Sequence, residues 1–348
     1  MTAPAQMTAV VFREHGGPEV LQVEQVPTPI PGPKQVRIAI AAVALNHLDL
    51  WVRRGGPAFH LELPHRLGSD IAGVVDAVGP GVTGVTVGQK AVVQPGLACG
   101  ICAACLSGRD NLCRHYKILG ENAQGGYAQY LVVPEANVAP YPERLDFPHA
   151  AASLLSFLTA WQMVVRKARV APGQVVLVHA AGSGVGVAAI QICKLFGATV
   201  ITTSSSAEKL ARAKELGADE GVDTTREDFV AACRARTGKR GVDAVIEHLG
   251  GDTFASSIKA VRSGGAIVTC GATAGATPTI DLRHVFFRQL QILGSTMGSK
   301  ADLLEVLAHV DAGRLQPVVD TVRPLAEAAE AHRALERRAA FGKIVLTP

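Results

Sequence analysis

The chain has 348 residues, of which 48% are hydrophobic and 18% are charged, and its formal net charge at pH 7 is only +4. This composition suits an ordered globular protein and excludes a disordered one, and the length predicts two domains. Because no run of like charges resembles a nucleic-acid or membrane patch, neither partner is expected. The N-terminal residues lack the regions of a signal peptide, so a cytoplasmic protein is expected.

The first part of the chain, to about residue 135, predicts β-strands joined by short turns. Alternating or apolar runs separated by Gly and Pro are typical of such strands. The runs lie at 9–12, 35–45, 71–79, 90–95 and 127–134. Pro27, Pro29, Pro31 and Pro33 indicate an extended, exposed connection within this part of the chain.

A loop at 96–116 holds four of the seven cysteines, Cys99, Cys102, Cys105 and Cys113. A disulfide framework does not fit a reducing compartment. Four thiolates at this spacing can surround one tetrahedral Zn²⁺, and a full shell of four leaves no open position for substrate. An iron–sulfur cluster is the alternative, but its C-x₂-C-x₂-C-x₃-C pattern has a shorter last gap. The spacing therefore predicts a structural zinc site.

From about residue 149 the pattern changes to helices that alternate with short apolar strands. Helices are expected at 149–168, 186–197, 207–218 and 253–264, and strands at 175–180, 199–204, 243–250 and 266–271. Apolar strands between helices indicate a parallel sheet covered on both faces. A further helix is expected at 299–315 and a closing strand at 342–348.

The strand at 175–180 leads into a glycine-rich turn that opens the next helix. This context predicts dinucleotide binding, since small residues let a pyrophosphate approach the helix N-terminus. The alternative is a tight crossover without a ligand. Because Ala181 and Ser183 replace two glycines, the strict G-x-G-x-x-G motif is absent. The predicted cofactor-binding turn consists of Ala181, Gly182, Ser183, Gly184, Val185 and Gly186.

The following strand ends in hydroxyl side chains where NAD-binding proteins carry an acidic residue. Ser204, Ser205 and Lys209 are candidates to bind a 2′-phosphate, so NADP(H) is favoured over NAD(H). In the alternative interpretation, Ser204–Ser206 only cap the next helix and Lys209 is solvated.

The order of these motifs resembles the medium-chain dehydrogenase/reductase superfamily, which includes the zinc alcohol dehydrogenases and the quinone oxidoreductases. The resemblance rests on segments along nearly the whole chain, among them "LNHLDLWVRRGG", "PHRLGSDIAGVVDAVGPGV", "GGYAQYLVVP", "AAGSGVG" and "FGKIVL". It implies an α/β protein with a GroES-like, β-rich catalytic domain, residues 1–156 and 299–348, and a Rossmann domain with a doubly wound parallel sheet, residues 157–298.

The resemblance also implies where a second, catalytic zinc would bind, and this sequence departs from that pattern. Asn46, Ser69 and Leu155 stand at the positions of its Cys, His and Cys ligands, and Leu48 replaces the proton-relay hydroxyl. Asn and Ser are poor zinc ligands and Leu is none. The catalytic zinc is therefore expected to be missing, unless His47, His65, Asp49 and Asp70 form an improvised site.

A site without a Lewis acid favours a substrate that is already electrophilic. We expect an NADPH-dependent reductase of quinones, enones or other activated carbonyl compounds, with Asn46 donating to a substrate oxygen and His47 as a proton source or phosphate contact. An alcohol dehydrogenase with an unusual metal site and a non-catalytic NADPH-binding protein are the alternatives. The resemblance suggests a homodimer or homotetramer, whereas the substrate and the direction of hydride transfer stay open.

Overall fold

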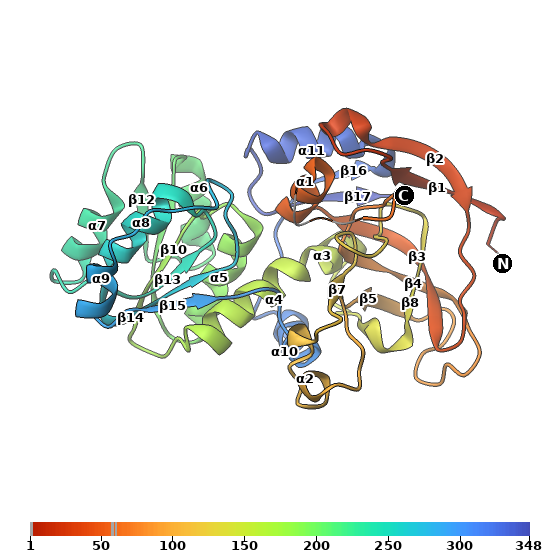
Figure 1. The fold of residues 1–348 in the computed structure, drawn as a ribbon, viewed down its shortest axis with the longest axis horizontal. Coiled ribbons are helices and arrows are strands. Elements are labelled where there is room, and N and C mark those ends of the chain that lie inside the picture. Colours follow the sequence, from red (N-terminus) through yellow and green to blue (C-terminus); the bar gives the residue numbers. More distant parts are fainter. Residues whose placement is uncertain (1–2, 57–58, 60) are drawn as a thin grey trace. The chain divides into compact units, whose positions relative to one another are not determined.

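The computed structural model describes residues 3–56, 59 and 61–348. The chain divides into two compact units, one of residues 1–156 with 299–348 and one of residues 157–298 (Figure 1). Among the described residues, no helix combines the length and the apolar character that crossing a bilayer requires.

The first unit is built on a seven-stranded sheet in the order β16–β17–β3–β4–β5–β9, with β8 also paired to β3. All its neighbours are antiparallel except β16 and β17. The strands are β3 (Gln35–Ala44), β4 (Asp70–Val78), β5 (Lys90–Val93), β8 (Tyr130–Pro134), β9 (Val138–Pro140), β16 (Val319–Pro324) and β17 (Lys343–Thr347). The last strand of the chain therefore lies beside β3 from its N-terminal part.

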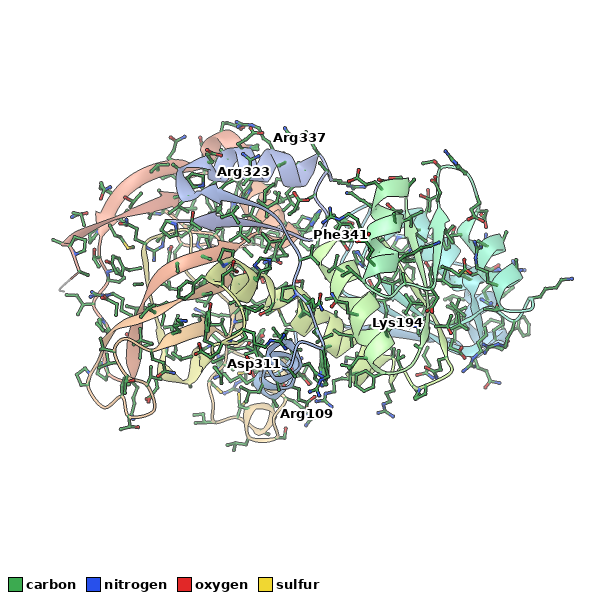
Figure 2. The ribbon with its side chains drawn as sticks, turned by 180° about the vertical axis from the view of Figure 1, so that it is seen from behind. Arg109, Lys194, Asp311, Arg323, Arg337 and Phe341 are labelled. Atoms are coloured by element: carbon green, nitrogen blue, oxygen red, sulfur yellow. The ribbon has the colours of Figure 1, made fainter. Side chains whose placement is uncertain are left out.

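Smaller elements complete this unit. An antiparallel pair joins β1 (Gln6–Val11) to β2 (Gln22–Pro27), and another joins β6 (Gly96–Leu97) to β7 (Lys117–Ile118). Its helices are α1 (His47–Arg54), α2 (Ala103–Leu106), α3 (Phe147–Ala152), α10 (Lys300–Asp311) and α11 (Ala328–Glu336). In Figure 2, Arg323 marks β16 and Arg337 marks the end of α11.

A buried polar network connects α1 to α11. Arg53 is 0% exposed, and its guanidinium bonds the Nδ1 atom of His332 at 2.9 Å and Glu336 at 2.6 Å. Because Arg is only a donor, Nδ1 accepts, so Nε2 carries the proton and donates to the Tyr127 hydroxyl at 3.0 Å. Burial lowers the pKa of His332 to about 3, so this imidazole is neutral at pH 7.

The second unit contains a six-stranded, fully parallel sheet in the order β12–β11–β10–β13–β14–β15. The strands are β10 (Val175–Val178), β11 (Thr199–Ser204), β12 (Glu220–Asp223), β13 (Val242–Glu247), β14 (Val261–Thr269) and β15 (Gln291–Gly294). Numbered from β10, this is the 3-2-1-4-5-6 order of the Rossmann fold. The predicted α/β fold class, a GroES-like β-rich unit with a Rossmann unit, is confirmed.

Helices cover this parallel sheet, as the apolar strands predict. They are α5 (Gly184–Leu195), α6 (Ala207–Glu215), α7 (Phe229–Arg236), α8 (Gly251–Ala260) and α9 (Leu282–Phe287). Lys194, labelled in Figure 2, lies near the end of α5 and pairs with Asp219 at 2.9 Å. The same carboxylate accepts the N–H of Val200, so the ion pair ties the helix to the start of β11.

Two predicted helices differ from the structure. The helix expected at 149–168 is divided into α3, α4 (Leu155–Trp161) and a π-helical stretch over Gln162–Lys167. At the first break, the Ser153 hydroxyl bonds the carbonyl of Ala150 at 2.7 Å, a local contact that competes with helix continuation. The helix expected at 253–264 ends at Ala260, because Val261 pairs with Val242 and begins β14.

Candidate functional site

The four cysteines of the 96–116 loop converge between β6 and β7. Their Sγ atoms lie within 4.8 Å of one another. Three separations are 3.5 Å for Cys102–Cys105, 3.6 Å for Cys99–Cys113 and 3.9 Å for Cys99–Cys105. Four thiolates bound tetrahedrally at about 2.3 Å from one zinc are about 3.8 Å apart, so the cluster fits a single ion. A cluster of several irons would place metal and sulfide between the thiolates.

The glycine-rich turn connects the end of β10 to the start of α5. Ser183 caps α5, its hydroxyl accepting the N–H of Gly186 at 2.9 Å. A Cβ atom on Gly186 would lie 2.3 Å from the carbonyl oxygen of Ala180, so only glycine fits there. The turn thus brings Ala181, Gly182, Ser183, Gly184, Val185 and Gly186 to the carboxyl end of the central strand, where Rossmann proteins bind pyrophosphate.

The hydroxyl side chains after β11 have local partners. Ser206 caps α6, its hydroxyl accepting the N–H of Lys209 at 3.3 Å, and the Ser204 hydroxyl accepts the N–H of Ser206 at 3.1 Å. Ser205 is exposed. The capping described as the alternative interpretation is therefore present, and it engages the hydroxyls of Ser204 and Ser206.

An acidic side chain that the sequence reasoning missed lies next to this position. Asp223 is the register partner of Ser204 on the neighbouring strand β12. Bonds from Thr225 lower the pKa of Asp223, which also pairs with Arg226 at 3.4 Å. The edge thus carries Lys209 on α6 and a partly neutralised carboxylate on β12. Only the strand order, which the sequence does not state, places Asp223 beside Ser204.

A polar network that the sequence analysis did not identify lies beneath the glycine-rich turn. His179 follows β10, and its ring bonds the hydroxyls of Thr203 at 3.1 Å and Ser257 at 2.9 Å. Burial, with a smaller effect of His248, lowers the pKa of His179 to about 3. The His248 ring in turn bonds the Ser183 hydroxyl at 3.0 Å. The helix cap of the cofactor turn is thereby linked to the end of β13.

Asn46 precedes α1 and forms a capping box with Asp49. The N–H of Asn46 donates to Asp49 at 2.7 Å, and the N–H of Gly68 donates to the other Asp49 oxygen at 3.0 Å. Burial raises the pKa of Asp49 to about 6. Asp49 therefore joins the start of α1 to the segment before β4, a structural role.

The Asn46 side chain contacts two charged, buried groups. Its Nδ2 atom donates to Asp70 Oδ2 at 3.0 Å and lies 3.5 Å from the carbonyl of Ala44, and its Oδ1 atom accepts from Lys343 Nζ at 2.5 Å. Lys343 also pairs with Asp70 Oδ2 at 2.9 Å. Because Val345 and Asp70 are both register partners of Ala44, the ends of β17, β3 and β4 meet here. Lys343 was not identified from the sequence.

The residues at the family's catalytic-zinc positions contact other groups of the chain. Ser69 donates its hydroxyl to the carbonyl of Leu119 at 2.7 Å, and Leu155 contributes only its backbone N–H, to Asp70 Oδ1 at 2.7 Å. The oxygen of Asn46 accepts from an ammonium group instead of being available to a cation. Within the described part of the chain, the cysteine cluster is the only place where three or more potential His, Cys, Asp or Glu ligands converge.

His47 begins α1 and is partly buried. Burial, followed by the positive charges of Arg338, Lys343 and Arg54, lowers the pKa of His47 to about 4. The imidazole is therefore neutral at pH 7 and available as a hydrogen-bond donor or acceptor.

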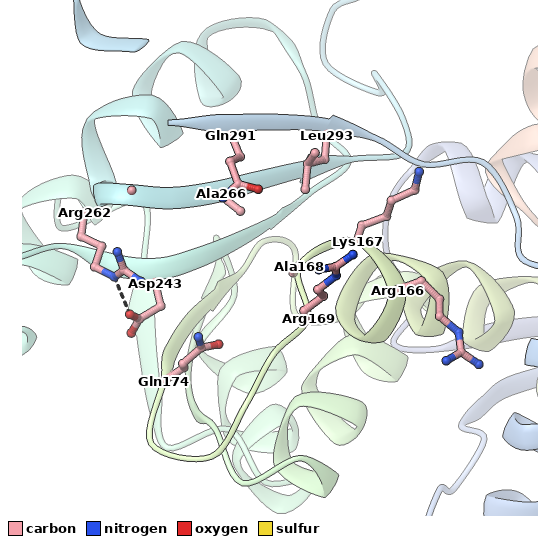
Figure 3. A pocket seen from close by; sticks show the side chains of 11 residues that line it. Arg166, Lys167, Ala168, Arg169, Gln174, Asp243, Arg262, Ala266, Gln291 and Leu293 are labelled. Carbon is pink, nitrogen blue, oxygen red and sulfur yellow. Dashed lines mark hydrogen bonds and ion pairs between the residues drawn. The ribbon is translucent and has the colours of Figure 1, made fainter. Parts of the chain in front are cut away.

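A cavity of about 510 Å³ lies at the opposite end of the parallel strands from the glycine-rich turn (Figure 3). Gln174, Asp243 and Gln291, which line it, lie at the amino ends of β10, β13 and β15. Arg262 reaches into it and pairs with Asp243 at 2.6 Å. Since Rossmann proteins bind nucleotides at the carboxyl ends, this cavity is not the nucleotide site.

A Rossmann unit with a glycine-rich turn and a β-rich unit with a four-cysteine lobe define a medium-chain dehydrogenase/reductase. Residues 32–143 match the alcohol dehydrogenase GroES-like domain, and residues 184–312 match the zinc-binding dehydrogenase family. The chain belongs to this family of alcohol dehydrogenases and quinone oxidoreductases and is an NAD(P)H-dependent oxidoreductase.

Relatives with different names cover the whole chain. A solved structure of an NAD-dependent alcohol dehydrogenase is 56% identical, covers 98% of this chain and 100% of its own, and has a TM-score of 0.95. The 2-haloacrylate reductase of Burkholderia sp is 32% identical over 98% of each chain. The quinone oxidoreductase of Homo sapiens is 29% identical over 99% of each chain.

Proposed function

We propose that this protein reduces a quinone, an enone or another activated carbonyl compound with NADPH and without a catalytic zinc. The proposal rests on the side chains that stand at the three positions of the family's catalytic-zinc ligands. The Asn46 oxygen accepts from an ammonium group, the Ser69 hydroxyl donates to a carbonyl, and Leu155 has no donor atom in its side chain. Two relatives are named as a quinone oxidoreductase and a 2-haloacrylate reductase.

The chain's residues supply the binding and polar environment that such a reaction needs. A nicotinamide dinucleotide supplies the hydride when bound, and the close approach at Gly186 and the α5 N-terminus fit its pyrophosphate. We assign to the Asn46 amide a hydrogen bond to a substrate oxygen, which becomes negative as a conjugated double bond is reduced. A neutral His47 can pass on a proton from solvent.

We propose NADP(H) as the preferred cofactor over NAD(H). The end of β11 carries Ser204 instead of an acidic residue, and Ser205 and Lys209 offer a hydroxyl and an ammonium group to a 2′-phosphate. Asp223 and the NAD-dependent relative support the opposite preference. The ratio of kcat/KM with NADPH to that with NADH distinguishes them, and a ratio above one is expected.

We propose that Cys99, Cys102, Cys105 and Cys113 hold one structural zinc ion. We also propose a cytoplasmic location, because a reducing compartment keeps the four thiols from forming disulfides. We also propose that residues 1–156 with 299–348 act as the catalytic domain and residues 157–298 as the nucleotide-binding domain. These bounds coincide with the two compact units.

We propose that a second copy of the chain covers the β15 edge. This edge strand pairs with no further strand among the described residues. Beside it, Phe286 and Phe287 on α9 are 59% and 76% exposed, and Ile292 on β15 is 40% exposed. A homodimer or homotetramer is expected by light scattering. A F286S/F287S variant is expected to dissociate, whereas a wild-type monomer would contradict the proposal.

Turnover across a panel of substrates tests the proposed reaction. The full chain should oxidise NADPH with a quinone and with an enone, and it should oxidise saturated alcohols with NADP⁺ far more slowly. Alcohol oxidation that depends on added zinc would instead support a metal-dependent alcohol dehydrogenase, and alcohol dehydrogenase is the activity for which the solved relative is named. Tight NADPH binding without any turnover would indicate a binding protein.

A further inference from the structure

The cavity at the amino ends of the parallel strands is lined mainly by basic and polar side chains. At about 510 Å³ it has the size of a site for a small metabolite. Among the described lining residues, Asp243 is the only acidic one, whereas the basic ones are Arg166, Lys167, Arg169 and Arg262. Because Arg166 engages another group of the chain, the charge available to a ligand comes from the other three.

Asp243 belongs to an ion-pair network on one wall of the cavity. Its carboxylate pairs with Arg262 at 2.6 Å and with Arg240 at 2.9 Å, and it accepts the N–H of Val175 at 2.8 Å. Burial raises the pKa of Asp243, but these bonds outweigh burial and lower the pKa to about 2, so the carboxylate is charged at pH 7. Since two guanidinium groups share one carboxylate, this wall keeps a net positive charge. Arg262 uses Nε for Asp243 and Nη1 for the carbonyl of Ser263, which leaves its Nη2 group without a partner among the described residues.

The opposite wall carries two further positive charges. Lys167 is the last residue of the π-helical stretch, and Arg169 follows it in the left-handed conformation, with a φ of 51°. Neither side chain forms an ion pair or a hydrogen bond with another residue in the described part of the chain. In Figure 3, both residues lie across the cavity from Arg262 and Asp243. Their charges are therefore available to a ligand.

Gln174 adds a neutral donor to this lining. Its Oε1 atom accepts the N–H of Ala171 at 3.1 Å, so its Nε2 group, which has no partner among the described residues, can donate to a ligand. The cavity thus offers donors on two separate walls, and its one carboxylate is already bonded. A phosphate group carries about −1.5 to −2 charges at pH 7 and accepts several hydrogen bonds. One phosphate group would satisfy one wall, and two separate phosphate groups would satisfy both.

We propose that this cavity binds a metabolite-sized anion with two separate phosphate groups, one held by Arg262 and the other by Lys167 and Arg169. The site is distinct from the cofactor site, because the glycine-rich turn lies at the carboxyl ends of the strands and the cavity lies at their amino ends. The proposal concerns binding alone and does not depend on the reaction that the protein catalyses. Since the ligand binds only the folded protein, it should also raise Tm.

Calorimetric titration of the full chain tests the site, with the protein saturated with NADP⁺ or NAD⁺, whichever binds more tightly, so that the cofactor site is filled. The probe is fructose 1,6-bisphosphate, and fructose 6-phosphate is the monophosphate comparison at the same ionic strength. The first variant is Arg169→Gly, because glycine adopts the left-handed backbone without strain and the fold should be at least as stable. Lys167→Met is a second variant on the same wall. Lys239→Gly is the matched control, since Lys239 carries the same charge on a left-handed backbone, with a φ of 68°, and does not line the cavity.

We expect one bisphosphate per chain, bound at least about tenfold more tightly than the monophosphate. Arg169→Gly and Lys167→Met should each weaken bisphosphate binding about tenfold, the effect of losing one charge-assisted contact, whereas Lys239→Gly should change it less than about twofold. The absence of saturable binding, equal affinity for the monophosphate, or an equal loss in Lys239→Gly would overturn the proposal. Displacement of the nicotinamide cofactor by the bisphosphate would also overturn it, since the anion would then occupy the cofactor site.

Discussion

The cysteine lobe and the Asn46–Asp70–Lys343 cluster solve a related problem in different ways. Each gathers polar side chains at one point of the β-rich unit. In the lobe, four thiolates fit a metal ion and complete its coordination. In the cluster, three strand ends meet around an ammonium group and a carboxylate that the chain itself provides. The comparison shows two different arrangements: four thiols that converge as a metal ion would require, and an ion pair that occupies the region where the family's second metal is expected.

Removal of one cysteine thiolate is expected to have the largest effect on zinc content and on thermal stability. Cys105→Ser should lower the zinc content from one per chain to near zero and unfold the lobe, because metal binding supplies its folding free energy. Metal analysis and the thermal unfolding curve measure both effects. Cys270→Ala is the control, since Cys270 lies outside the cluster. Full zinc retention in Cys105→Ser would show that the ion is held differently.

Breaking the Asp70–Lys343 ion pair is expected to have the second-largest effect, a loss of unfolding free energy. Asp70→Ala leaves the Lys343 charge buried without its carboxylate, which should cost about 3–5 kcal/mol in the free energy of unfolding. Asp76→Ala is the matched control on the same strand, because the Arg37–Asp76 pair is only partly buried, at 12% and 18% side-chain exposure. Denaturant unfolding compares them. Equal losses of unfolding free energy in both variants would mean that breaking the buried Asp70–Lys343 pair costs no more than breaking a partly buried one.

Acid should destabilise the β-rich unit through His332. Its folded pKa of about 3 lies below the ordinary value of 6.5, so the unfolded chain takes up the proton first. The contribution of His332 to the free energy of unfolding is therefore fully present above pH 6.5. It falls as the pH decreases toward 3, by about 2 kcal/mol at pH 5. His332→Asn should flatten this part of the pH profile, whereas His284→Asn, on the exposed face of α9, should not. Parallel profiles for all three proteins would exclude this role.

The smallest expected effect concerns the cofactor. Lys209→Ala should raise the KM for NADPH about fivefold, corresponding to about 1 kcal/mol for one charge–phosphate contact, and leave the KM for NADH unchanged. Lys214→Ala, on the same helix, is the control. If the KM values for both cofactors rise together, Lys209 contributes to the fold of α6 and not to the choice of cofactor.

Local patterns predicted much of this molecule. The cysteine spacing predicted that four thiols converge, the strand–glycine–helix pattern predicted the turn between β10 and α5, and apolar strands between helices predicted the parallel sheet. Lys343 lies 297 residues from Asn46, and only the pairing of β17 with β3 brings them together. Likewise, Asp223 lies beside Ser204 because of the strand order. Contacts that depend on the strand order cannot be predicted from local sequence patterns.

The zinc content of an active preparation tests the central claim most directly. We predict one zinc per chain, lost on Cys105→Ser and retained in D70N/K343M, with enone reduction by NADPH unaffected when further zinc is supplied. Two zinc ions per chain, with the second removed by a chelator together with the activity, would contradict it.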